Sequence, residues 1–137
     1  MDAATRDAVR RRADNRCEYC QLHQQHSYTT HHIEHIVARQ HDGSEGLENL
    51  ALACAWCNLH KGPNLTGIDP ISSEIVSLFN PRRDQWGEHF RFQDAHIEGI
   101  SAIGRTTVRV LAMNDANRLE LRSAFLSSDL SGIGSAT

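Results

Sequence analysis

Two short cysteine motifs decide the fold of this chain, Cys17-Glu18-Tyr19-Cys20 and Cys54-Ala55-Trp56-Cys57. Each motif supplies two thiols from one tight turn, and four thiolates can surround a zinc ion tetrahedrally at about 2.3 Å. Because residues 21–53 separate the motifs, a shared ion would join two distant parts of the chain. The predicted ligands of this structural zinc ion are Cys17, Cys20, Cys54 and Cys57.

Disulfide bonds and a redox-active C-x-x-C motif are the alternative uses of these cysteines. Disulfides need an oxidising compartment, which nothing in the sequence indicates. A thioredoxin-like motif needs a surrounding βαβ pattern and does not require a second cysteine pair. The spacing therefore favours structural zinc, which by itself does not identify an enzyme.

The composition limits the class of protein. A chain of 137 residues with 39% hydrophobic residues fits one domain with a modest core. Its apolar runs fall far short of the roughly 20 residues that a membrane helix needs, and Asp2, Arg6 and Asp7 interrupt any signal peptide. We therefore expect a cytoplasmic protein that does not enter a membrane. The net charge of −3 argues against a non-specific DNA coat but permits a local basic patch.

The sequence around the cysteine motifs predicts a hairpin between two helices. Thr5 can cap a helix that runs to about residue 15. The β-branched run at 29–37 and the apolar run at 47–53 predict two paired strands. A helical turn at 58–61 should end at Gly62-Pro63.

The second half of the chain is predicted to be a strand and helix extension. We expect a connecting loop at 62–70, strands at 74–79, 89–92 and 96–100, and a helix at 102–113. Asn114 can cap a last helix that ends near residue 126. Residues 131–137 are small and polar, and a disordered tail is expected there.

Polar side chains gather between the cysteine motifs. On a strand, the alternation within His31-His32-Ile33-Glu34-His35 places His32 and Glu34 on one face and His35 on the other. Asn49 lies in the second predicted strand, and Asn58 follows the second cysteine motif. Lys61, the only lysine of the chain, shares a helix face with Asn58.

This arrangement resembles the HNH endonuclease family, in the subtype whose ββα-metal core is braced by four cysteines. The resemblance covers about residues 17–62, and it rests on the cysteine motifs, Glu34-His35-Ile36, Asn49-Leu50 and Asn58-x-x-Lys61-Gly62. The stretches at 62–65 and 80–83 are similar to those of small bacterial stand-alone HNH proteins. A bacterial origin is therefore expected.

The resemblance implies a role for each polar residue. His35 matches the general base, and Asn49 matches the asparagine that fixes the loop and orients that base. Glu34 and Asn58 match the ligands of a catalytic divalent ion, for which oxygen donors favour Mg²⁺ or Mn²⁺. Lys61 is either a solvated helix end or a phosphate contact, and His32 is a second candidate for phosphate contact.

Two departures from the family pattern concern this site. Glu34 stands where aspartate is usual, and Ala38 stands where proline often follows the His-Ile pair. The first changes the reach of the carboxylate by one methylene group. The second removes a rigid turn but no chemical group.

We therefore predict a small α+β protein: a zinc-braced ββα-metal core with an N-terminal helix and a C-terminal strand and helix extension. Residues 1–130 are expected to form a single nuclease domain, with the core at 17–62 and the extension at 70–128. The expected function is metal-dependent hydrolysis of DNA. The resemblance implies double-stranded DNA as the substrate, but the residues themselves do not distinguish double-stranded DNA from single-stranded DNA or RNA. The alternative is a zinc-stabilised nucleic-acid-binding module without catalysis.

Overall fold

The structure, a computed structural model, describes residues 1–126. Among these residues it contains two compact units, one made of residues 1–65 and 80–84 and the other of residues 66–79 and 85–126. Both units combine helices with short antiparallel strands, which confirms the predicted α+β class. The tail predicted at 131–137 lies outside the described residues.

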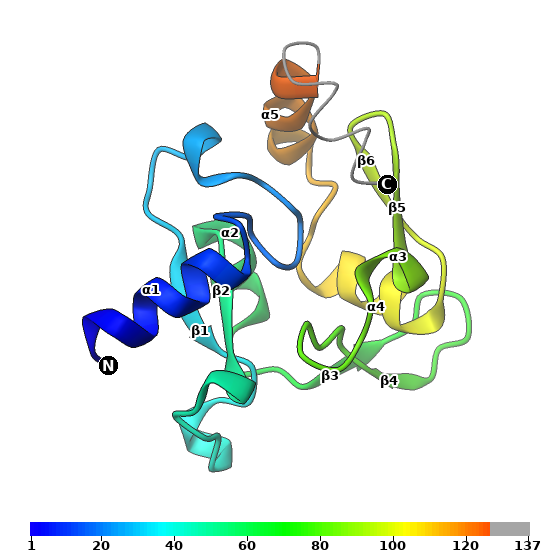
Figure 1. Ribbon diagram of the computed structural model, residues 1–137. Helices are drawn as coiled ribbons and strands as arrows, with labels where there is room; N and C mark the ends of the chain where they lie inside the picture. The colour runs from blue at the N-terminus through cyan, green and yellow to red at the C-terminus, as the bar shows by residue number, and fades with distance from the viewer. Residues whose placement is uncertain (127–137) are drawn as a thin grey trace. The chain divides into compact units, whose positions relative to one another are not determined.

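The first unit is built on an antiparallel hairpin between two helices (Figure 1). In this hairpin, Ile33 lies opposite Leu52 and His35 lies opposite Leu50. The elements of the unit are α1 (Ala3–Arg12), η1 (Gln24–His26), β1 (His32–His35), η2 (Arg39–His41), η3 (Leu47–Asn49), β2 (Leu50–Ala53) and α2 (Ala55–Lys61).

The leucine and alanine residues of β2 alternate, and each kind serves one face of the hairpin. Leu50 and Leu52 form a buried cluster with Val9 of α1, and Ile33 packs against it. The alternation places Ala51 and Ala53 on the opposite face, where α2 contacts both strands. Small side chains on that face let α2 approach the hairpin closely.

The elements of the first unit differ from the prediction at their ends. Asp2, not Thr5, caps α1, because its carboxylate accepts a hydrogen bond from the Thr5 amide at 2.8 Å. Strand β1 begins later than residue 29, since side chains of the preceding segment bind the Thr29 carbonyl at 2.9 Å and 2.8 Å. Helix α2 begins earlier than residue 58 and ends as predicted at Gly62, whose φ of 51° suits glycine.

The second unit contains two further hairpins, and its helix α4 packs against strands of both. The segment 62–70 is not a simple connecting loop, because residues 66–68 pair with 75–77. This three-residue strand contains glycine and is too short to show an alternating pattern. The elements of the unit are β3 (Thr66–Ile68), β4 (Ile75–Ser77), α3 (Trp86–His89), β5 (Phe90–Gln93), β6 (His96–Gly99), α4 (Ala102–Val110) and α5 (Ala116–Leu126).

Asn114 has a different role from the predicted helix cap. Its side-chain amide pairs with the backbone of Ile97 in β6, accepting from the amide at 2.9 Å and donating to the carbonyl at 2.7 Å. It therefore continues the hydrogen bonding of the β5–β6 hairpin instead of starting α5. Across residues 1–126, no helix combines the length and the apolar character that crossing a membrane would require.

Candidate active site

The four cysteines of the two motifs come together in the first unit. All four are buried, and their Sγ atoms lie within 4.8 Å of one another. The Cys20 and Cys54 sulfurs are 3.7 Å apart, close to the edge of about 3.8 Å that a ZnS₄ tetrahedron with 2.3 Å bonds would have. Burial raises the pKa of the Cys17 thiol, and a bound cation would favour its thiolate form. The cluster is compatible with a structural zinc ion.

The two residues inside the first cysteine motif connect this cluster to the hairpin. The Glu18 amide donates to the Leu52 carbonyl at 2.8 Å, and the Glu18 carboxylate accepts from the Leu52 amide at 2.8 Å. The hydroxyl of the buried Tyr19 donates to Oε1 of Glu34 in β1. The turn of the first cysteine motif thus contacts both strands of the hairpin, including β1, which carries Glu34 and His35.

Asn49 fixes the loop between the strands. Its Oδ1 accepts from the Val37 amide at 2.9 Å, and its Nδ2 donates to the carbonyls of Val37 at 2.9 Å and Ser44 at 2.8 Å. These three bonds close the loop directly after His35. The side chain is buried, so its contribution is to backbone geometry.

Glu34 and Lys61 form a buried ion pair. Their residues are 5% and 2% exposed, and Nζ of Lys61 lies 3.7 Å from Oε1 of Glu34. The ammonium group also donates to the Ile36 carbonyl at 2.9 Å. Burial raises the pKa of Glu34 to about 7, although the neighbouring Lys61 and Tyr19 act in the opposite direction. Lys61 is therefore buried beside Glu34 and is not the solvated helix end that was one of its two expected roles.

His35 lies on the other face of β1 and is only partly covered. Its side chain is 15% exposed, and Nε2 lies 3.0 Å from Oε2 of Glu45. Arg39 holds the same carboxylate with both Nε and Nη2, at 2.9 Å and 3.2 Å. Sequence reasoning does not identify Glu45, because a glutamate in a polar loop carries no periodic or motif signal.

The remaining candidate residues differ in how far they are exposed to solvent. Asn58 is half-buried and lies three residues before Lys61, on the same face of α2. His32 is exposed and shares its strand face with Glu34, so it remains available to a ligand. His31 is buried, and its Nε2 lies 2.9 Å from the Leu22 carbonyl, which makes it a core histidine.

Replacement of Tyr19 by phenylalanine is expected to destabilise the first unit. It removes one buried hydroxyl and leaves Oε1 of Glu34 without that donor, which typically costs about 1–3 kcal/mol. Denaturant unfolding of the zinc-loaded protein measures the change in the free energy of unfolding. Tyr28→Phe is the matched control, because Tyr28 is fully exposed. Equal stability of the two variants would contradict a structural role of the Tyr19 hydroxyl.

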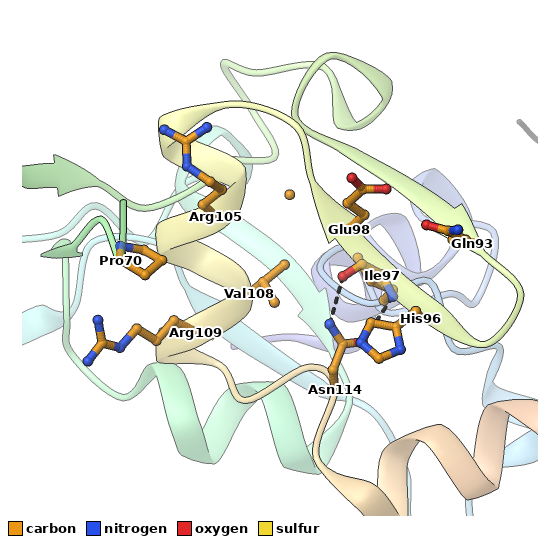
Figure 2. A pocket seen from close by; sticks show the side chains of 10 residues that line it. Pro70, Gln93, His96, Ile97, Glu98, Arg105, Val108, Arg109 and Asn114 are labelled. Atoms are coloured by element: carbon orange, nitrogen blue, oxygen red, sulfur yellow. Dashed lines mark hydrogen bonds between the residues drawn. The ribbon is translucent and has the colours of Figure 1, made fainter. Parts of the chain in front are cut away.

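The second unit carries a pocket of about 360 Å³ (Figure 2). None of the candidate site residues described above lines this pocket. Val108 and Ile97 contribute apolar surface, and the guanidinium groups of Arg105 and Arg109 point away from each other along α4. Arg105 is held by the buried Asp69 at 3.0 Å and 2.8 Å. The lining also contains His96 and Glu98, and the Glu98 carboxylate accepts from Nε of Arg91 at 2.8 Å.

Comparison with known proteins places the cysteine cluster and the hairpin in one family. Residues 17–64 match the model of the HNH endonuclease family. The Septu protein PtuB of Bacillus thuringiensis is 28% identical over 111 residues, which cover 78% of this chain and 40% of that relative. The chain thus spans well under half the length of that relative, whose bacterial source agrees with the expected origin. No solved structure matches the chain. Residues 17–64 are an HNH endonuclease domain, and their four-cysteine cluster fits the zinc-braced subtype of that family.

Proposed function

We propose that this protein is a divalent-metal-dependent endonuclease that hydrolyses DNA phosphodiester bonds, with His35 as the general base. The observation that carries the proposal is the position of His35 within the HNH domain. It ends β1, its ring is partly open to solvent, and the Asn49 bonds fix the backbone that follows it.

The proposed reaction needs a base that can take a proton from water. The unperturbed pKa of histidine, about 6.5, suits this work near neutral pH. The His35 ring would accept the proton, and the resulting hydroxide would attack phosphorus. The bond to the 3′ oxygen then breaks, and that oxygen takes a proton from solvent water, which leaves 5′-phosphate and 3′-hydroxyl ends.

The proposed ligands of the catalytic ion are Glu34 and Asn58. Both offer oxygen atoms, the donor type that Mg²⁺ and Mn²⁺ prefer. The buried Glu34 carboxylate gains from added positive charge, because burial disfavours its ionised form. When bound, the ion would supply positive charge that stabilises the transition state and the leaving oxygen. In the same proposal the four cysteines hold zinc, and the substrate is double-stranded DNA.

The buried ion pair supports one competing function, a zinc-stabilised nucleic-acid-binding module without catalysis. Lys61 already places a positive charge 3.7 Å from Glu34. A carboxylate neutralised in this way has less need of a metal ion. Binding of a labelled duplex without cleavage, at Mg²⁺ and Mn²⁺ concentrations up to the millimolar range, would favour this second function. Parallel lanes with single-stranded DNA and RNA would show which nucleic acid is the substrate.

Replacement of Glu34 by glutamine is expected to raise the Mg²⁺ concentration needed for half-maximal cleavage at least tenfold. The change removes the only formal negative charge that the proposed ligand set offers the ion. Glu34→Asp should have a smaller effect, because it keeps the charge and restores the residue usual in the family.

A metal titration of plasmid cleavage measures this effect. Asp42→Asn is the control, since Asp42 is an exposed carboxylate of the same unit. Zinc content and circular dichroism establish that each variant is folded. An unchanged metal dependence of folded Glu34→Gln would show that Glu34 is not a ligand.

A further inference from the structure

Glu45 contacts the predicted general base but belongs to no motif. Its carboxylate Oε2 lies 3.0 Å from Nε2 of His35, within hydrogen-bond distance. Nε and Nη2 of Arg39 donate to the two carboxylate oxygens of Glu45, at 2.9 Å and 3.2 Å. Bidentate guanidinium contacts of this kind fix both the position and the plane of a carboxylate.

The backbone around Glu45 is also held in place. The carbonyl of the neighbouring Ser44 accepts from Nδ2 of Asn49 at 2.8 Å, and the Ser44 hydroxyl donates to Oε1 of Glu48 at 2.6 Å. The Ser44 hydroxyl also accepts from the Gly46 amide at 2.8 Å. The residues on both sides of Glu45 are thus held by hydrogen bonds, and these bonds fix the backbone position from which the Glu45 side chain extends.

The contact has a consequence for the protons of the imidazole ring. The hydrogen bonds from Arg39 and His35 lower the pKa of Glu45 to about 2, so its carboxylate is ionised near neutral pH. An ionised carboxylate only accepts hydrogen bonds. Nε2 of His35 must therefore carry the proton in this contact, and in the neutral ring Nδ1 is left with the free lone pair.

We propose that Glu45 is a positioning residue for His35: it holds the ring and keeps the proton on Nε2, so that Nδ1 is the atom that takes the proton from water. This inference rests on the proposed function, because it assumes that His35 is the base. Arg39 completes the arrangement by anchoring Glu45. The three side chains form a His35–Glu45–Arg39 chain of contacts between the end of β1 and the loop that follows it.

The expected effect of Glu45 on the rate is moderate. Residues that orient a functional histidine typically contribute 10–100-fold when they are lost. Glu45 is 57% exposed, and solvent weakens exposed charged contacts, so we expect the lower end, about tenfold, for Glu45→Ala. Glu45→Gln keeps an acceptor oxygen but not the charge, and a smaller loss is expected. Both changes should appear in kcat with KM for DNA unchanged.

The experiment combines cleavage rates with the ¹⁵N spectrum of the histidine rings in the zinc-loaded full chain. The spectrum is taken at about pH 8.5, above the ordinary titration range of histidine, and His35→Gln identifies the His35 signals. The wild type should show a protonated Nε2 and an unprotonated Nδ1. In Glu45→Ala the bonded Nε2 proton should exchange rapidly with water. Asp42→Asn, a change of an exposed carboxylate in the same loop, should leave rate and spectrum at wild-type values.

The possible outcomes separate this inference from the proposed function. A protonated Nδ1 in the wild type would overturn the inference. Equal rates of DNA cleavage by the wild type, folded Glu45→Ala and folded Glu45→Gln would also overturn the inference. A wild type with the expected ring pattern that cleaves no nucleic acid would instead contradict the proposed function, and with it the catalytic use of Glu45.

Discussion

Replacement of His35 by alanine is expected to slow DNA cleavage by about 10²–10⁴-fold, the usual contribution of a general base. The side chain lies at the end of β1 and is partly exposed, outside the buried cluster of Val9, Leu50 and Leu52. Its loss should therefore leave the fold, the zinc content and the affinity for DNA nearly unchanged. Single-turnover cleavage of a plasmid, together with a binding assay, measures the two properties separately.

His41→Ala is the matched control for this prediction. His41 is an exposed histidine on the loop that follows β1, so the control removes the same group from the same region. It should cleave at the wild-type rate. Wild-type turnover by His35→Ala would remove His35 from the reaction and direct attention to His32, the exposed histidine on the other face of β1.

Replacement of Cys57 by serine is expected to abolish stable folding of the first unit. Structural zinc sites contribute on the order of 10 kcal/mol in small domains, as much as the whole stability of a typical domain. Cys57 is 1% exposed and belongs to the four-sulfur cluster, so serine would leave a buried hydroxyl in place of a thiolate ligand. Metal analysis should find less than one zinc per chain, and thermal unfolding should lose its cooperative transition.

Leu59→Ser is the matched control for the cysteine variant. Leu59 lies on the same helix, two residues further on, but its side chain is exposed. The control should bind one zinc ion and unfold close to the wild-type temperature. A cooperatively folded Cys57→Ser protein that contains no metal would show that the cysteine cluster is not a zinc site on which the fold depends.

Cysteine spacing makes the centre of the first unit predictable. Two C-x-x-C motifs and a β-branched run restrict the chain to few arrangements, and the hairpin and the cysteine cluster follow from them. These features depend on local sequence and on one metal constraint. The resemblance implies a loop-fixing role for Asn49, and the three hydrogen bonds of its side chain agree with that role. Its expected place in a strand is wrong, because residues 47–49 form η3 and β2 begins at Leu50.

Contacts between side chains of different segments are less predictable. The hydrogen bonds between Tyr19 and Glu34 and between His35 and Glu45 form only because loops bring residues from different segments close together. Lys61 shows the same limit: a lysine at a helix end is normally solvated, yet here the helix directs its ammonium group into the core beside Glu34. A sequence pattern gives the face of an element but not the partner that another segment supplies.

Short elements are the other source of error. Strand β3 has three residues, one of which is glycine, and helix α3 has a single turn. Neither is long enough to show a period of 2 or 3.6 residues. The cap of α1 is displaced because Asp2 and Thr5 are both good capping residues, and only the three-dimensional contact selects Asp2.

Metal-dependent cleavage of a supercoiled plasmid tests the central claim most directly. Wild-type protein with its zinc intact is incubated with Mg²⁺ or with a low concentration of EDTA, beside His35→Ala and His41→Ala. We expect nicking by the wild type and by His41→Ala in Mg²⁺, arrest by EDTA before zinc is lost, and recovery when Mg²⁺ is restored. Nicking that persists in EDTA, or that His35→Ala performs at the wild-type rate, would contradict a metal-dependent nuclease with His35 as its base.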